Sequence, residues 1–181
     1  MKRFLSFLWE TGKVIILALV IVVPIRMFVF QPFLVRGESM EPNFHQGDYL
    51  VIDELSFRFR DPGRGEVIVL KFPGDTSQRY IKRIIGLPGE TVKVQDGKVT
   101  VLKDEKEIVL NESNYLPLSL QTPGSTNVSL QDNEYFVMGD NRIFSSDSRQ
   151  WGVLSRDLLV GRALIRLFPP NALAKIQEVS Y

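Results

Sequence analysis

The chain has 181 residues, a formal net charge of +1, no cysteine and a single histidine, His45. Its 22 basic and 21 acidic residues are balanced, and no basic run is interleaved with aromatic residues, so nucleic acid is not an expected partner. The absence of cysteine excludes disulfides and thiolate catalysis, and one histidine leaves no ordinary zinc ligand set. The composition allows one principal core, and we expect any chemistry to need neither metal nor cofactor.

Residues 1–30 have the pattern of a membrane anchor. The apolar run Val14–Phe30, interrupted by one arginine, is close to the shortest helix that crosses a hydrocarbon core of roughly 30 Å. Lys2, Arg3 and Lys13 precede the run, and the positive-inside rule then places the N-terminus in the cytoplasm. We expect a single-pass protein of a cell membrane (inner, plasma or thylakoid), with residues 31–181 outside the cytoplasm.

Two alternatives to a retained anchor fit the same residues less well. A cleavable secretory signal would end in small residues, whereas this run continues into Arg26-Met27-Phe28. A buried core helix is the other alternative, but runs this apolar are uncommon in small soluble domains.

Residues 31–181 alternate short β-rich segments with turn-forming residues, which predicts a mainly β domain with no room for βαβ crossovers. Asp96-Gly97 is the clearest hairpin turn, since both positions of a type I′ turn need positive φ. The stretch 103–132 is polar and turn-rich, and we expect a peripheral insertion there. The predicted strands cover residues 49–52, 66–72, 79–85, 91–95, 98–102, 107–110, 135–138 and 158–168.

Ser39 is a candidate nucleophile. Phe33, Val35, Gly37 and Ser39 alternate along a segment predicted to be extended, so we expect them to face one way, with the glycine leaving space before the serine. The sequence that follows Ser39 favours a turn that presents the hydroxyl.

Lys82 is a candidate base. Strand alternation places Tyr80, Lys82 and Ile84 on one face, so the ammonium group lies between apolar neighbours. Desolvation lowers the pKa of such a lysine, and a base that works near neutrality needs a pKa about 3 below the usual value, which is worth about 4 kcal/mol. Arg83 cannot replace it, because a guanidinium does not release its proton.

The segment 139–149 is dense in turn-forming and hydrogen-bonding residues. Ser145 is suited to accept a hydrogen bond from a neutral lysine, because a hydroxyl does not favour the charged amine as a carboxylate would. Asp147 and Arg149 are spaced to brace the loop as a charge-assisted pair.

Taken in order, these segments resemble the type I bacterial signal peptidases, membrane enzymes that remove signal peptides from exported proteins. The resemblance runs over nearly the whole chain. Four ordered motifs carry it: Gly37-Glu38-Ser39-Met40-Glu41-Pro42; Gly47-Asp48-Tyr49-Leu50-Val51 with Arg64-Gly65-Glu66-Val67-Ile68; Arg79-Tyr80-Ile81-Lys82-Arg83-Ile84-Ile85-Gly86-Leu87-Pro88-Gly89-Glu90; and Gly139-Asp140-Asn141-Arg142 with Ser145 and Asp147-Ser148-Arg149.

The resemblance implies a coiled antiparallel β-sheet domain with a reduced cap insertion, behind a single N-terminal transmembrane helix. It implies that Ser39 is the acyl-forming nucleophile and Lys82 the general base. Ser145 would orient the lysine, and Asp147 with Arg149 would support the site.

The resemblance also implies a substrate. We expect cleavage of exported preproteins after Ala-x-Ala-like residues, with no cofactor, by an enzyme whose partners are preproteins, membrane lipid and the protein-export machinery. An extended substrate would pair with the strand that begins at Phe33. We expect small pockets lined by Phe33, Val35, Met40, Tyr80 and Ile81.

The chain departs from the family pattern at two positions near the nucleophile. Asn43 stands where threonine is usual, and we expect a local turn variation there. Gly37 stands where some members have a serine that helps to bind the oxyanion, so the backbone N–H of Ser39 would need another donor beside it.

Other functions fit parts of the sequence. One is a hydrolase that uses Ser39 and His45 with Asp48 or Asp53, as triad logic allows. Another is a catalytically silent, membrane-tethered β module that binds exported proteins. A third is a serine-lysine peptidase that cleaves itself or a repressor, but such enzymes lack a membrane span.

Overall fold

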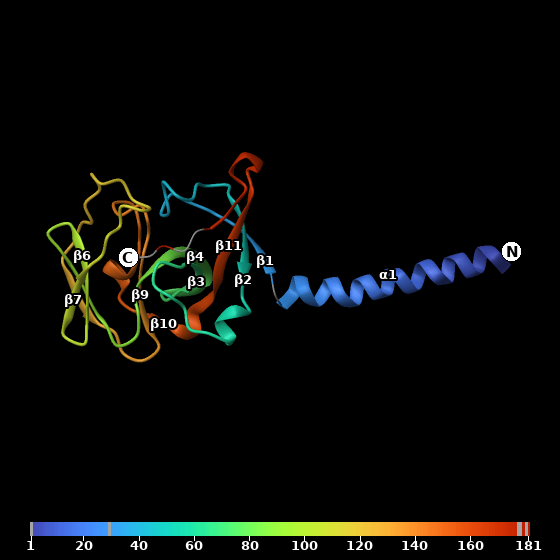
Figure 1. Ribbon diagram of the computed structural model, residues 1–181, viewed down its shortest axis with the longest axis horizontal. Coiled ribbons are helices and arrows are strands. Elements are labelled where there is room, and N and C mark those ends of the chain that lie inside the picture. The colour runs from blue at the N-terminus through green and yellow to red at the C-terminus, as the bar shows by residue number, and fades with distance from the viewer. Residues whose placement is uncertain (1, 29, 177–178, 180) are drawn as a thin grey trace.

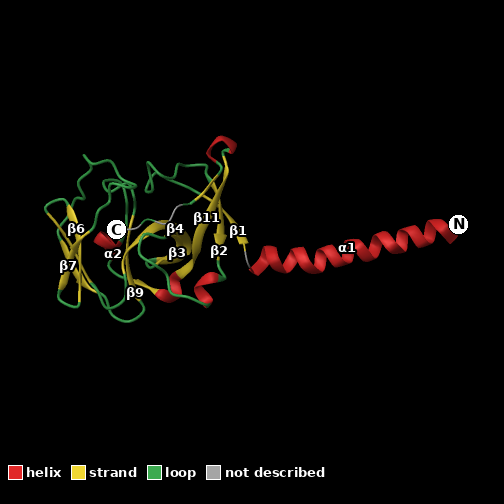
Figure 2. Ribbon diagram, in the orientation of Figure 1, coloured by secondary structure: helices red, strands yellow, loops and turns green. Residues whose placement is uncertain are grey.

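The computed structural model describes residues 2–28, 30–176, 179 and 181, and it contains a long N-terminal helix and a β-rich domain (Figure 1, Figure 2). The strands are β1 (Phe30–Leu34), β2 (Tyr49–Asp53), β3 (Val67–Phe72), β4 (Asp75–Gly86), β5 (Thr91–Gln95), β6 (Lys98–Lys103), β7 (Lys106–Val109), β8 (Thr126–Ser129), β9 (Glu134–Met138), β10 (Leu154–Ser155), β11 (Leu159–Phe168) and β12 (Ala174–Lys175). The helical segments are α1 (Lys2–Phe28), η1 (Ser56–Arg58), α2 (Ser148–Trp151), η2 (Arg156–Leu158) and η3 (Pro170–Ala172).

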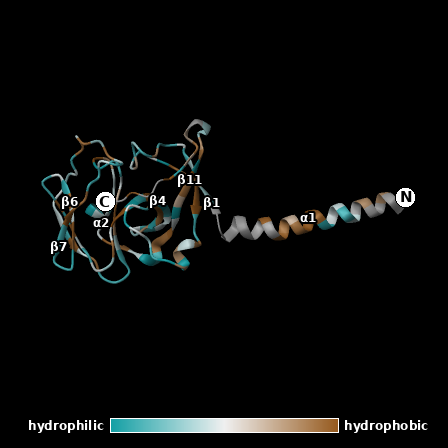
Figure 3. Cartoon of the chain, in the orientation of Figure 1, coloured by the Kyte–Doolittle hydropathy of each residue, from teal (hydrophilic) through white to brown (hydrophobic). Residues whose placement is uncertain are grey.

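Helix α1 covers most of the segment predicted as a membrane anchor and projects away from the β-rich domain (Figure 1). Hydrophobic residues follow a hydrophilic stretch along the helix (Figure 3), and the side chains from Val14 to Val20 are exposed. Within the part of the chain that the structure describes, no helix combines the length and the hydrophobicity needed to cross a bilayer. Val29, near the end of the predicted anchor, lies outside the described residues.

The larger sheet has the strand order β1-β2-β11-β3-β4-β9-β10, with β12 paired to β11, and its neighbouring strands are antiparallel. This arrangement confirms the prediction of a mainly β, antiparallel domain. Strands β3 and β4 form a hairpin at its centre, and their register places Lys82 opposite Ile68. The candidate base therefore lies on a strand that has partners along both of its edges.

Strand β4 is buried on both faces near Lys82. Ile81 packs into a core cluster built from β2 and β3, whereas Ile84, with the half-buried Tyr80 beside it, packs into a cluster built from β3 and β9. The predicted placement of Tyr80 and Ile84 on one face is confirmed. Lys82 is only 3% exposed, because both layers of the core close around its strand.

The smaller sheet has the order β7-β6-β5-β8 (Figure 1). Its β5–β6 hairpin turns at Asp96 and Gly97, whose φ values are +52° and +76°, so the predicted turn with two positive φ angles is confirmed. Gly86, at the end of β4, lets the two sheets approach each other. A Cβ atom at this position would lie 2.3 Å from Cγ2 of Val92 on β5, so a larger residue would push the sheets apart.

The segment 103–132, predicted as a peripheral insertion, supplies β7 and β8 to the smaller sheet. Strand β8 was not predicted, because its sequence Thr-Asn-Val-Ser is polar and forms a strand only through its pairing with β5. The segment also buries Leu110, Tyr115 and Leu116. Part of it therefore belongs to the packed interior of the domain.

Candidate active site

The structure brings Ser39 and Lys82 together. Nζ of Lys82 lies 2.8 Å from Oγ of Ser39 and 3.0 Å from the backbone oxygen of Ile81. Lys82 comes from the middle of β4, and Ser39 comes from the loop between β1 and β2, 43 residues earlier in the chain. A hydroxyl and an amine at this distance can exchange a proton directly.

The surroundings of Lys82 disfavour its ammonium form. Burial is the main cause, and it lowers the pKa of Lys82 from 10.5 to about 8. The negative charges of Asp147 and Asp140 act in the opposite direction and raise this pKa, whereas the positive charge of Arg149 adds to the lowering. The net shift corresponds to about 3 kcal/mol of differential stability between the two protonation states.

Ser39 lies in a loop of successive turns between β1 and β2, and not in an extended strand. Strand β1 ends at Leu34 and Gly37 has φ +80°, so the prediction that an extended alternation continues to Ser39 is wrong beyond Leu34. The backbone N–H groups of Asn43 and Phe44 donate instead to the backbone oxygen of Met40, which closes a turn just after the serine.

The loop that begins at Gly139 packs directly against the nucleophile. The backbone N–H of Asn141 donates to the backbone oxygen of Ser39 at 3.0 Å, and the Asn141 side chain donates to the backbone oxygen of Glu38 at 3.1 Å. A Cβ atom on Gly139 would lie 2.3 Å from the backbone oxygen of Ser39 and 2.2 Å from Oγ of Ser145. Position 139 therefore has room for glycine alone.

Asp147 and Arg149 form the pair that their spacing predicts. Nε and Nη2 of Arg149 donate to the two carboxylate oxygens of Asp147, each at 2.8 Å. Asp147 also accepts from the backbone N–H of Gly139 at 3.0 Å and caps helix α2. Burial alone would raise the pKa of Asp147, but the hydrogen bonds and charge of Arg149 outweigh burial and hold it below its usual value.

Ser145 lies beside the dyad without the contact that was predicted for it. It is 3% exposed, and its hydroxyl makes no hydrogen bond of regular geometry to the residues that the structure describes. The hydroxyl nevertheless lies close enough to the carboxylate of Asp147 to help lower the pKa of that group. The hydrogen bonds of Lys82 go to Ser39 and to the backbone of Ile81 instead. Ser145 packs against Gly139, so its place in the site comes from packing rather than from a bond to the lysine.

His45 and the two aspartates near it do not form a triad with Ser39. His45 is exposed, and its backbone N–H, rather than its ring, donates to Asp48 at 3.1 Å. Asp48 pairs with Arg166 at 3.1 Å, and Asp53 accepts hydrogen bonds from the turn at residues 55–56. The serine's close partner is Lys82.

A cleft of about 700 Å³ leads to the dyad. Three residues predicted to line it, Phe33, Tyr80 and Ile81, do so. Val35 and Met40, also predicted there, are instead each 1% exposed in a core cluster. Val35 follows the end of β1 at Leu34, where the predicted strand alternation stops, and Met40 lies in the turn after Ser39. The lining residues are Pro32, Phe33, Leu34, Arg36, Gly37, Ser39, Ser77, Gln78, Arg79, Tyr80, Ile81, Lys82 and Ser146.

Comparison with known proteins decides the family. The family model described as signal peptidase, peptidase S26, matches residues 8–168. The chain belongs to this family. It is 38% identical to a probable signal peptidase I-2 of Synechocystis over 88% of this chain and 73% of that protein. It is 35% identical to a signal peptidase I of Bacillus amyloliquefaciens over 93% of this chain and 89% of the relative.

The chain is 35% identical to signal peptidase I T of Bacillus subtilis, over 90% of this chain and 86% of that relative. A solved signal peptidase I from Enterococcus faecalis matches with a TM-score of 0.47 and 27% identity, over 57% of this chain and 97% of that one.

Several buried contacts of this S26 family member were not found by sequence reasoning. Arg83 donates to both carboxylate oxygens of Asp140 at 2.8 and 2.6 Å, and Arg142 binds Glu112 at 2.7 and 2.6 Å. Asn43 joins the first pair, since its side chain donates to Asp140 at 2.9 Å. No local pattern signals these contacts, because each joins residues at least 30 positions apart.

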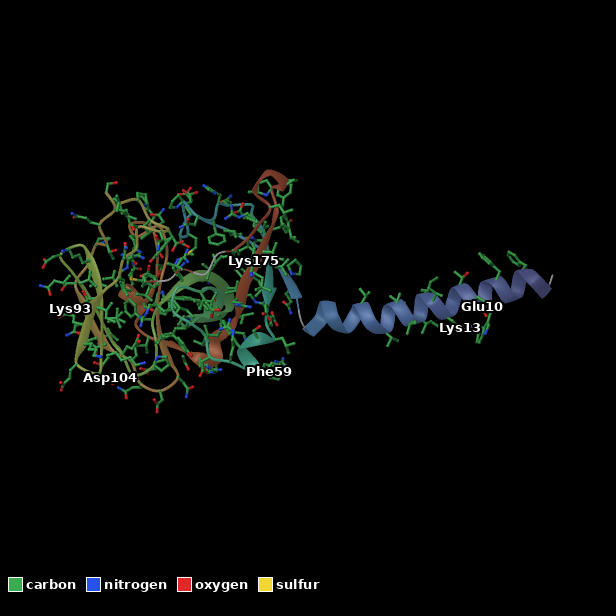
Figure 4. All side chains as sticks on the ribbon, viewed as in Figure 1. Glu10, Lys13, Phe59, Lys93, Asp104 and Lys175 are labelled. Carbon is green, nitrogen blue, oxygen red and sulfur yellow. The ribbon has the colours of Figure 1, made fainter. Side chains whose placement is uncertain are left out.

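We predict that Arg149→Gln raises the pKa of Lys82 above about 8, because the substitution removes a positive charge that lowers this pKa. The measurement is NMR titration of isotope-labelled lysine side chains in the full chain in detergent. Lys175, exposed on β12 (Figure 4), is the reference whose resonance should not differ between the two proteins. An unchanged or lower Lys82 midpoint in the variant would contradict this electrostatic role.

Proposed function

We propose that this chain is a signal peptidase I, a serine endopeptidase that removes N-terminal signal peptides from exported preproteins, with Ser39 as nucleophile and Lys82 as general base. The single observation that carries the mechanism is the 2.8 Å distance between Oγ of Ser39 and Nζ of a lysine that is 3% exposed. Membership of the signal peptidase family supports the choice of substrate class.

Acylation begins when the neutral amine of Lys82 removes the proton of Ser39 as Oγ attacks the scissile carbonyl carbon. The C–O bond forms, and the carbonyl electrons move onto the oxygen to give a tetrahedral oxyanion. Preorganised N–H donors stabilise this charge, and we assign the backbone N–H of Ser39 as one of them. The oxyanion then collapses, the C–N bond breaks, and protonated Lys82 gives its proton to the leaving amine.

Deacylation repeats the proton transfers with water in place of the hydroxyl. Neutral Lys82 takes a proton from a water molecule, whose oxygen attacks the ester carbon and forms a second oxyanion. The C–O bond to Ser39 breaks, and Lys82 returns its proton to the serine oxygen. One side chain thus serves as base and acid in both halves of the reaction, which a pKa of about 8 allows near neutral pH.

The cleft provides a place for an extended peptide. One wall comes from β1 and the residues after it, and the other comes from the segment 77–82 of β4. We place the residues that precede the scissile bond between these walls, as a strand added to the exposed edge of the sheet. We assign Phe33, Tyr80 and Ile81, which line the cleft, to the pockets that receive the small residues of an Ala-x-Ala-like site.

We also propose that α1 anchors the enzyme in a cell membrane, with the N-terminus cytoplasmic and the catalytic domain outside. The exposed apolar side chains from Val14 to Val20 support this assignment, because such a surface is costly in water. The β2 and β11 end of the domain exposes Tyr49, Leu167 and Phe168, between 45% and 52% each, as a second apolar surface suited to lipid. Membrane lipid and the export machinery that delivers preproteins are the partners this location implies.

The dyad is tested by replacing its members in the full chain reconstituted in lipid or detergent. Ser39→Ala and Lys82→Ala should each lower kcat/KM for a preprotein by about three orders of magnitude or more. Lys82→Arg should be equally inactive, because a guanidinium keeps its proton. His45→Ala should retain full activity, and N-terminal sequencing of the product locates the cut.

Full activity in the Lys82→Ala protein would exclude the lysine mechanism, and loss of activity only in His45→Ala would favour the histidine alternative. A wild-type chain that binds preproteins and leaves them intact, with Ser39→Ala behaving identically, would indicate a silent binding module.

The anchor is tested by alkaline carbonate extraction of membranes that carry the full chain. The wild-type protein should stay in the pellet, whereas Leu17→Arg combined with Val20→Arg should move it to the supernatant, since each central arginine costs about 3 kcal/mol of insertion free energy. Phe7→Arg, which adds the same charge before the apolar run, is the control and should remain in the pellet. Release of the wild-type chain would contradict the anchor.

A further inference from the structure

The insertion at residues 103–132 reaches the catalytic loop through a buried arginine. Arg142 is 1% exposed and donates to Glu112 at 2.7 and 2.6 Å, to the hydroxyl of Thr122 at 2.7 Å and to the hydroxyl of Tyr115 at 3.0 Å. All three partners lie in the insertion, between β7 and β8. Both Nη atoms of Arg142 are therefore held by the insertion.

The same arginine fixes the backbone that touches Ser39. Its Nε donates to the backbone oxygen of Gly139 at 3.0 Å, and its own backbone oxygen accepts from Arg149 at 2.7 Å. Asn141, the residue just before it, donates its backbone N–H to the backbone oxygen of Ser39 at 3.0 Å. A displacement of Arg142 would therefore pass to the nucleophile through one intervening residue.

A second route joins the insertion to both halves of the dyad through Tyr115. The side chain of Asn43 donates to the backbone oxygen of Tyr115 at 2.8 Å and to Asp140 at 2.9 Å, which ties the nucleophile loop to the insertion. The Tyr115 ring lies 4.2 Å from the guanidinium carbon of Arg83, the residue next to the general base. Asn43 thus does more than vary a local turn, which corrects the expectation drawn from the sequence.

These contacts are not explained by stability alone. A buried ion pair contributes little net stability, because desolvation of the two charges offsets their attraction. A catalytic pair, in contrast, must be held within roughly 0.5 Å of its productive geometry, and a misplacement of about 1 Å can cost about a hundredfold in rate. The Arg142–Glu112 pair joins the insertion to the loop whose position matters most for that geometry.

We propose that Glu112 and Tyr115 are positioning residues for peptide-bond cleavage: by holding Arg142 and Asn43, they fix loop 139–142 and so set Ser39 against Lys82. The proposal rests on the Ser39–Lys82 mechanism proposed above. It assigns to the insertion, a segment outside the motifs that carry the family resemblance, a direct part in the efficiency of this enzyme.

The test compares Glu112→Gln with Glu107→Gln in the full chain in detergent, with preprotein as substrate. Glu112→Gln keeps the side-chain shape but replaces one acceptor of Arg142 with an N–H donor. It should lower kcat about ten- to a hundredfold, leave KM within about twofold because the cleft walls are untouched, and move the ascending limb of the pH profile upward as Lys82 becomes less buried. Glu107, exposed on β7, is the matched control and should change none of these.

Tyr115→Phe is the second variant and decides the question if Glu112→Gln fails to fold. It removes the hydroxyl that binds Arg142 and Glu112 but keeps the ring over Arg83, so it should show the same changes to a smaller extent. Folded variants with a lower melting temperature but wild-type kcat and pH profile would overturn the proposal. Ser39→Ala separates the two failures: if it is inactive while Glu112→Gln and Tyr115→Phe are unaffected, the dyad stands and the positioning role is wrong.

Discussion

The site depends on one constraint: an amine is buried where the sheet leaves it almost no water. Strand β4 pairs with β3 at Lys82 and with β9 from Arg83 onward, and the core packs around it, so Lys82 is only 3% exposed and its pKa falls to about 8. Two carboxylates lie close enough to undo this effect, and both raise the pKa. Each has its own arginine: Arg83 binds Asp140, and Arg149 binds Asp147. The buried ion pairs thus protect a lysine that must be able to lose its proton.

The sheet and loop around Lys82 both bury the base and shape the site where the substrate would bind. The larger sheet buries the base and, by its free β1 edge, forms one wall of the cleft. Loop 139–149 crosses behind the nucleophile and holds it from the backbone, which is possible because Gly139 has no side chain. The smaller sheet does not touch the cleft, yet its connecting segments hold that loop through Glu112 and Tyr115.

Sequence reasoning succeeded where the controlling interactions are local. The Asp96-Gly97 turn, the alternation along β4 and the Asp147–Arg149 pair are each set by residues within a few positions of one another. It failed where a strand ends and its alternation no longer applies, and where a contact depends on the packing of segments that are distant in the sequence. Val35 is buried rather than lining the cleft because β1 ends before it, and the contacts of Arg142 and Asn43 depend on how the two sheets meet.

The most direct test of the central claim is the pH dependence of kcat/KM for preprotein cleavage between about pH 6 and pH 10. Because the neutral amine is the active form, the rate should rise tenfold per pH unit at low pH and level off with a midpoint near 8, where Lys82 loses its proton. A profile that is flat across this range, or an ascending limb near pH 6.5 that disappears in the His45→Ala protein, would contradict the account.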